Sequence, residues 1–166
     1  MMNASFDLPD PIVFTTGTVG DPGERVFFLQ AQGEGVVVTL KCEKQQVGAL
    51  ADYLAGMLAD LPTVDQDHVP TLLGLVSPLV PEWVIGTLAV AWDEDADRMV
   101  LVAEELLTEE EVEAGVAPAQ ARFRLSREQV AAFVEHAKEV VAGGRPPCPL
   151  CGGPLDATGH DCPRLN

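Results

Sequence analysis

The feature that most constrains the fold is an order of elements that occurs twice: three strand-like segments followed by an amphipathic helix. In the first run we expect strands at 12–19, 25–32 and 36–42, which are rich in β-branched and aromatic residues and separated by Gly, Pro and Asp turns. A helix is expected over 43–61, where apolar residues recur at a helical spacing. Pro62 then ends it, because proline cannot continue a helix.

The second run repeats this plan. Strands are expected at 83–92, 98–104 and 121–125. Ser126 opens the helix, with Gln129 three residues later as a capping box, and Gly143 and Gly144 end it.

The two runs also correspond in sequence. Gly17–Val19 matches Gly86–Leu88 near the start of each run, and Gln46–Leu50 matches Gln129–Phe133 in each helix. We therefore predict an α+β fold of duplicated βββα units, at about 12–61 and 83–142, that form an antiparallel sheet with both helices on one face. The alternative is chance similarity between two amphipathic helices that follow strands. The duplicated domain is expected to span 1–144.

A connection of unusual length, 63–82, separates the two runs and contains three prolines. Loops this long are often functional or mobile. Its apolar residues indicate instead that it lies against the body of the protein. They are Leu72, Leu73, Leu75, Val76, Leu79 and Val80. A second segment, 109–120, is acidic and is expected to be an exposed loop or a short helical excursion.

The carboxy-terminal tail, 145–166, has the spacing C-x₂-C-x₈-H-x-C, formed by Cys148, Cys151, His160 and Cys162. Three cysteines and a histidine are among the usual ligand sets of tetrahedral structural zinc, so we predict that these four residues bind one Zn²⁺. Metal binding would supply the folding free energy of so short a segment, on the order of 10 kcal/mol. The alternatives are a disordered tail with free thiols and a redox dithiol, although redox dithiols normally open a helix beside a strand.

Composition excludes several classes of function. The chain of 166 residues has a net charge of −16, which opposes binding to nucleic-acid phosphates and to anionic membranes. No apolar run approaches the roughly 18 residues of a membrane helix, and the N-terminus has no signal-peptide pattern. Clustered cysteines with a histidine indicate a metal site in a reducing compartment, so a cytoplasmic location is expected.

Two loop motifs resemble ligand sites but are better interpreted as turns. Asp93, Asp95 and Asp97 mimic part of a calcium loop, but Arg98 stands where glycine is needed and strands flank the segment. The glycines of Gly17–Gly23 resemble a phosphate loop, yet a strand follows them.

The remaining cysteine, histidine and tryptophan residues do not form a recognisable catalytic site in the sequence. Cys42 is expected in the core, because its counterpart in the second run is Leu125. His68 and His136 are expected to be solvated. Trp83 and Trp92 are expected in the core. We find no nucleophile–base pair, no carboxylate dyad and no residue assigned to a cofactor other than the metal.

Several segments resemble an uncharacterised actinobacterial family, domain of unknown function 3090. They are Gly17–Gly23, Phe27–Ala31, Glu43–Val47 and the tail from Gly144 to Arg164. The resemblance implies an origin beside genes for a phosphoglycerate-mutase-like phosphatase and a kinase-like protein, and hence a shared pathway. It transfers no catalytic residue to this chain.

Three hypotheses for function follow. The first is a zinc-stabilised, non-catalytic binding or adaptor protein that meets an unknown protein partner through an open sheet face or its tail. The second is an enzyme, or an enzyme subunit, that acts on a phosphorylated small molecule. The third is nucleic-acid binding through the tail, which Arg145 and Arg164 favour and the net charge opposes.

Overall fold

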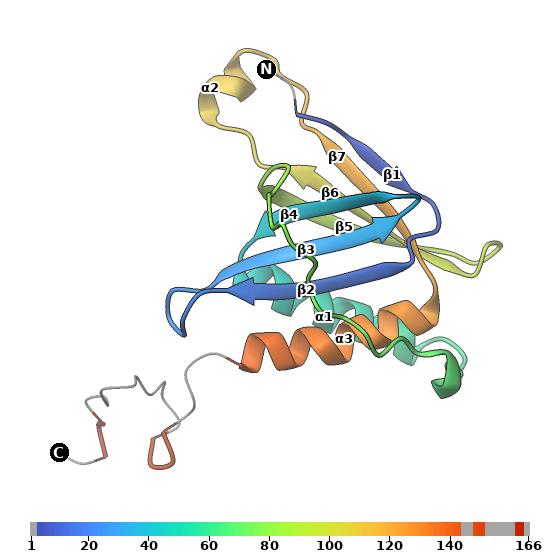
Figure 1. Ribbon diagram of the computed structural model, residues 1–166, viewed down its shortest axis with the longest axis vertical. Coiled ribbons are helices and arrows are strands. Elements are labelled where there is room, and N and C mark those ends of the chain that lie inside the picture. Colours follow the sequence, from blue (N-terminus) through green and yellow to red (C-terminus); the bar gives the residue numbers. More distant parts are fainter. Residues whose placement is uncertain (1–2, 144–147, 152–161, 165–166) are drawn as a thin grey trace.

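The structure is a computed structural model that describes residues 3–143, 148–151 and 162–164. Its elements follow one another in the order expected from the sequence, with two short additions, the strand β1 and a 3-10 turn at Gln66–His68 (Figure 1). The short helix α2 lies in the segment 109–120, where a loop or a short helical excursion was expected. The complete order is β1 (Phe6–Leu8), β2 (Val13–Val19), β3 (Val26–Gly33), β4 (Val36–Cys42), α1 (Lys44–Ala59), β5 (Ile85–Asp93), β6 (Arg98–Glu105), α2 (Glu109–Glu113), β7 (Gln120–Leu125) and α3 (Arg127–Ala142).

The strands form two sheets, so the single antiparallel sheet predicted from the sequence is wrong. One sheet has the order β2-β3-β4 and is antiparallel, while the other has the order β1-β7-β6-β5, with β1 parallel to β7. Beside β4, Lys41 and Val84 form a parallel bridge between the two sheets, and the N–H of Glu82 donates to the carbonyl of Thr39 at 2.8 Å. One residue beyond this bridge β4 ends, and the Gln46 side chain of α1 donates hydrogen bonds to the carbonyls of Ile85 and Gly86, at 3.2 and 3.4 Å.

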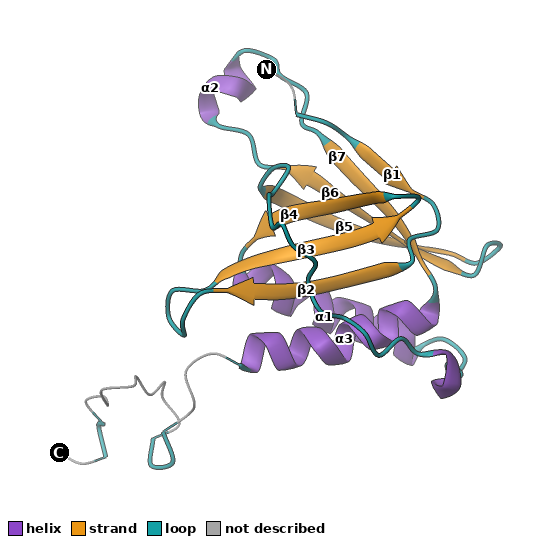
Figure 2. Ribbon diagram, viewed as in Figure 1, coloured by secondary structure: helices purple, strands orange, loops and turns teal. Residues whose placement is uncertain are grey.

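A single core lies between the inner faces of the two sheets and the helices α1 and α3. The ring of Phe14 in β2 lies 5.5 Å from that of Phe123 in β7 and 4.9 Å from that of Phe133 in α3, measured between centroids. This contact therefore joins both sheets to α3. Figure 2 shows α1 and α3 together on one side of the strands.

Both long helices begin with the same reciprocal bond. The backbone N–H of Ser126 donates to Oε1 of Gln129 at 3.0 Å, and the N–H of Glu43 donates to Oε1 of Gln46 at 2.8 Å. The Ser126 hydroxyl also accepts from the Gln129 N–H at 3.1 Å, which confirms the predicted capping box. The Nε2 of Gln129 donates to the carbonyl of Pro11, just before β2, at 2.6 Å. Each helix start is thus tied to the beginning of the other run.

The connection 63–82 lies across the outer face of the β2–β4 sheet, as its apolar residues predict. The buried amide of Gln30 exchanges two hydrogen bonds with the backbone of Val76, and the Thr15 hydroxyl donates to the carbonyl of Leu73 at 2.5 Å. This sheet face is therefore covered. It does not provide the open surface that the adaptor hypothesis assumed.

Candidate metal centre

The tail cysteines come together in the part of the tail that the structure describes. Residues 149–151 form a turn that brings Cys151 back toward Cys148, and Cys162 joins them from eleven residues further along the chain. The three Sγ atoms all lie within 4.8 Å of one another. Cys148 and Cys162 are buried, and Cys151 is half-buried. The predicted grouping of these three residues is thus present.

The sulfur spacing suits a shared metal. The Sγ atoms of Cys148 and Cys162 are 3.9 Å apart. A tetrahedral site with Zn–S bonds of about 2.3 Å has sulfur–sulfur edges of about 3.8 Å. A disulfide would need about 2.05 Å, and the four cysteines of the chain form no disulfide. Three soft thiolates at this spacing can therefore ligate a metal ion such as zinc.

The turn also favours the thiolate form of Cys148. The backbone N–H groups of Cys151 and Leu150 donate to its sulfur, and they lower the pKa of the Cys148 thiol from 9.0 to about 7. Neighbouring thiols at Cys151 and Cys162 add to this effect. Because the thiolate is the metal-binding form, this turn favours the binding of a cation by Cys148.

The fourth predicted ligand, His160, lies outside the described residues. The chemistry assigned to the described tail therefore rests on Cys148, Cys151 and Cys162. Three thiolates leave one position of a tetrahedron for an imidazole, a water molecule or a partner's side chain.

Cys42 differs from the tail cysteines and is a core residue, as expected. Its side chain at the end of β4 is 3% exposed. Burial, with a smaller contribution from the charge of Glu43, raises the pKa of its thiol to about 12. A neutral thiol in the core is a poor nucleophile and a poor metal ligand.

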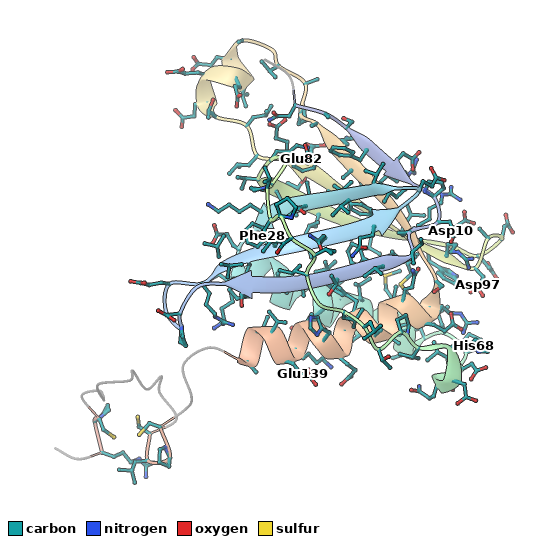
Figure 3. The ribbon with its side chains drawn as sticks, in the orientation of Figure 1. Asp10, Phe28, His68, Glu82, Asp97 and Glu139 are labelled. Atoms are coloured by element: carbon teal, nitrogen blue, oxygen red, sulfur yellow. The ribbon has the colours of Figure 1, made fainter. Side chains whose placement is uncertain are left out.

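The acidic hairpin between β5 and β6 is a turn, as the sequence indicates. The Asp93 carboxylate accepts from the Ala96 N–H at 3.1 Å and lies 3.7 Å from Arg124. Asp97 lies in this hairpin (Figure 3), and its carboxylate accepts from Nε of Arg127 at 2.9 Å. These carboxylates are engaged by arginines and by the backbone. Within the described residues, the tail cysteines are the one group of possible metal ligands that the structure gathers.

One functional feature was not predicted from the sequence. His136 was expected to be solvated, but its Nε2 donates to the carbonyl of Thr16 in β2 at 2.8 Å. It lines a groove of about 700 Å³ between α3 and the connection, with Glu135, Lys138 and Glu139. One signal in the sequence could have indicated this contact: His136 lies one helical turn after the buried Phe133. His68, by contrast, is exposed and bonds Asp65 at 2.7 Å, as expected.

None of the helices in the described part of the chain combines the length and the apolar character that a membrane crossing requires.

Comparison with known proteins identifies a family and no characterised relative. No curated protein and no solved structure matches the chain significantly. The family model described as protein of unknown function (DUF3090) matches residues 5–162, which include all three clustered cysteines. The chain therefore belongs to the family with this domain of unknown function, 3090.

Proposed function

We propose that Cys148, Cys151 and Cys162, with His160 as fourth ligand, bind one Zn²⁺ that folds the tail, and that the protein is a non-catalytic binding or adaptor protein of the cytoplasm. The observation that carries the proposal is the separation of 3.9 Å between the Sγ atoms of Cys148 and Cys162. This separation matches one edge of a zinc tetrahedron and is far longer than a disulfide.

A structural role for the metal is favoured over a catalytic role. Two of the three thiols, those of Cys148 and Cys162, are buried, and a fourth ligand from the tail would close the coordination sphere. Catalytic zinc keeps a position open for water or substrate.

The alternative, an enzyme acting on a phosphorylated small molecule, is less well supported. Such a substrate needs a cationic pocket. The groove beside His136 has two carboxylates, Glu135 and Glu139, against the single Lys138. A second groove, of about 520 Å³ on the outer face of β5–β7, has Asp93, Glu94 and Asp95 against Arg122 and Arg124. Neither groove favours a phosphate.

Elemental analysis tests whether zinc is bound, on protein purified without metal-affinity chromatography. We expect one zinc per chain in the wild type and in Cys42→Ala, and none retained in the Cys148→Ser/Cys162→Ser double variant. Wild-type protein free of zinc would refute the proposal.

Affinity purification from native cells tests the adaptor role. We expect a protein partner that binds the wild type and not the Cys148→Ser/Cys162→Ser variant. Recovery of a bound metabolite without any protein partner would favour the enzyme.

We also propose that the two strand–strand–strand–helix runs arose by duplication. The equivalent bonds that Gln46 and Gln129 make at the two helix starts support this. An experimental structure should superpose 12–61 on 83–142 with these glutamines on each other. A shift of the two glutamines out of register would contradict the duplication.

A further inference from the structure

The three tail thiols differ in their access to solvent. Cys148 and Cys162 are buried, at 7% and 5% exposure, whereas Cys151 is half-buried. Oxidation of sulfur follows thiolate character and exposure, and metal ligation keeps all three sulfurs in the thiolate form. A small oxidant such as hydrogen peroxide therefore reaches a reactive sulfur first at Cys151.

A second thiol lies in contact with Cys151. The backbone N–H groups of Cys151 and Leu150 donate to the sulfur of Cys148, which the Cys151 side chain also contacts. The turn 149–151 joins these two cysteines, so their sulfurs can approach each other without rearrangement of a longer segment. Cys162 lies 3.9 Å from Cys148, but it is buried and belongs to a separate stretch of the chain. Cys148 is thus the thiol placed to react with an oxidised Cys151.

A disulfide and a shared zinc ion exclude each other at these sulfurs. The three Sγ atoms lie within 4.8 Å of one another, whereas the sulfurs of a disulfide are about 2.05 Å apart. Two sulfurs on one zinc ion are held about 3.8 Å apart. Oxidation of two tail cysteines to a disulfide therefore removes two ligands of the metal.

The remaining cysteine of the chain does not compete for the oxidant. Cys42 is 3% exposed in the core, and burial raises the pKa of its thiol to about 12. A buried neutral thiol reacts poorly with peroxide. Oxidation is therefore confined to the tail.

We propose that the tail is a redox switch, in which a peroxide oxidises Cys151, Cys148 forms a disulfide with it, and the zinc ion is released. The switch rests on the zinc site of the proposed function. Disulfides of cytosolic proteins are usually transient, and many of them sense oxidants. Loss of the metal removes the free energy that folds the tail, so oxidation stops binding through the tail until the disulfide is reduced.

The oxidation takes two electrons from two sulfurs. The Cys151 thiolate attacks one oxygen of hydrogen peroxide, so that a sulfur–oxygen bond forms, the oxygen–oxygen bond breaks and hydroxide leaves. The Cys148 thiolate then attacks the sulfur of the resulting sulfenic acid, which forms the disulfide and expels a second hydroxide. Each hydroxide takes a proton from solvent, so peroxide is reduced to two water molecules. The zinc ion keeps only Cys162 and the proposed ligand His160, and it dissociates.

The test treats the zinc-loaded full chain with a molar excess of hydrogen peroxide while a chromogenic chelator reports free zinc. Wild type should release one zinc per chain and lose two of its four thiols, with the disulfide mapped to Cys148 and Cys151 by mass spectrometry. Dithiothreitol should restore all four thiols and the binding of zinc. Zinc retained with intact thiols, zinc released without a disulfide, or a disulfide that includes Cys162 would overturn the switch. Wild type that contains no zinc before oxidation would refute the metal centre itself, and the switch with it.

Three variants assign the roles of the individual cysteines. Cys42→Ala is the matched control and should release zinc and form the disulfide as wild type does. Cys162→Ser and Cys148→Ser each remove a zinc ligand, so their readout is the product at sulfur and not the metal. Peroxide should still form the disulfide in Cys162→Ser, whereas in Cys148→Ser it should add oxygen to Cys151 without a disulfide. A disulfide that forms in Cys148→Ser at the wild-type rate would contradict the role of Cys148.

Discussion

The side-chain amide of Gln30 binds the backbone of Val76 through two hydrogen bonds. Its Nε2 donates to the Val76 carbonyl at 3.0 Å, and its Oε1 accepts from the Val76 N–H at 2.8 Å. Gln30 is 1% exposed, so these bonds are shielded from water. A polar residue in the middle of β3 thus holds the connection 63–82 on the sheet.

Replacement of Gln30 by leucine should destabilise the protein by about 1–3 kcal/mol, because it removes both hydrogen bonds to the Val76 backbone. Urea unfolding measures the change, and hydrogen exchange should be faster at the Val76 amide. Gln32→Leu, on the same face of β3, is the matched control and should have little effect. Equal stability of Gln30→Leu and wild type would contradict the assigned role.

Gly17 provides space for Leu75 of the connection. A Cβ at Gly17 would lie 2.6 Å from both Cγ and Cδ1 of Leu75. Gly17→Ala should therefore cost about 1–3 kcal/mol through overpacking. In a double-mutant cycle with Leu75→Ala, the loss caused by Gly17→Ala should largely disappear. Additive losses would show that the two residues do not contact.

The four cysteines should separate into two classes in alkylation experiments. Cys42 is buried and the pKa of its thiol is raised to about 12, so it should stay unmodified in the folded protein. The tail cysteines should be protected by zinc and become reactive after chelation. Mass spectrometry should thus find no label in the native protein, label on Cys148, Cys151 and Cys162 with a chelator, and a fourth label only on unfolding. Rapid labelling of Cys42 in folded protein would contradict its placement.

Zinc retention should depend on pH in a direction set by Cys148. Its thiol pKa is lowered to about 7 in the folded turn, so the thiolate is favoured there relative to the unfolded tail. The resulting stabilisation is complete above the ordinary pKa of 9.0 and is lost as the pH falls through about 7. A chromogenic chelator should therefore extract zinc progressively faster as the pH falls below about 7. Extraction that is independent of pH between 8 and 5 would contradict thiolate ligation.

The sequence predicted elements whose signals are local. Segments rich in β-branched and aromatic residues, bounded by turn residues, identified the three strands of each run to within about two residues. Ser126 and Gln129 identified the start of α3, because a capping box depends only on residues three apart. The apolar residues of the connection predicted that it lies on the body, but they did not indicate which face it covers.

The features that could not be predicted depend on contacts between distant residues. Nothing local shows that β4 does not pair along β5, so that the strands form two sheets, or that Gln46 reaches the carbonyl of Ile85. The bond from His136 to Thr16 joins residues of different runs for the same reason. In the tail, the spacing of the cysteines was enough to predict their clustering, whereas ligation by His160 stays a prediction.

The most direct test of the metal centre is X-ray absorption spectroscopy at the zinc edge on the purified full chain. We expect a shell of three sulfur atoms at about 2.3 Å and one nitrogen at about 2.0 Å, with the nitrogen lost in His160→Ala. The Cys42→Ala variant should give the wild-type spectrum. A zinc shell of oxygen and nitrogen alone, or protein without stoichiometric zinc, would contradict the account.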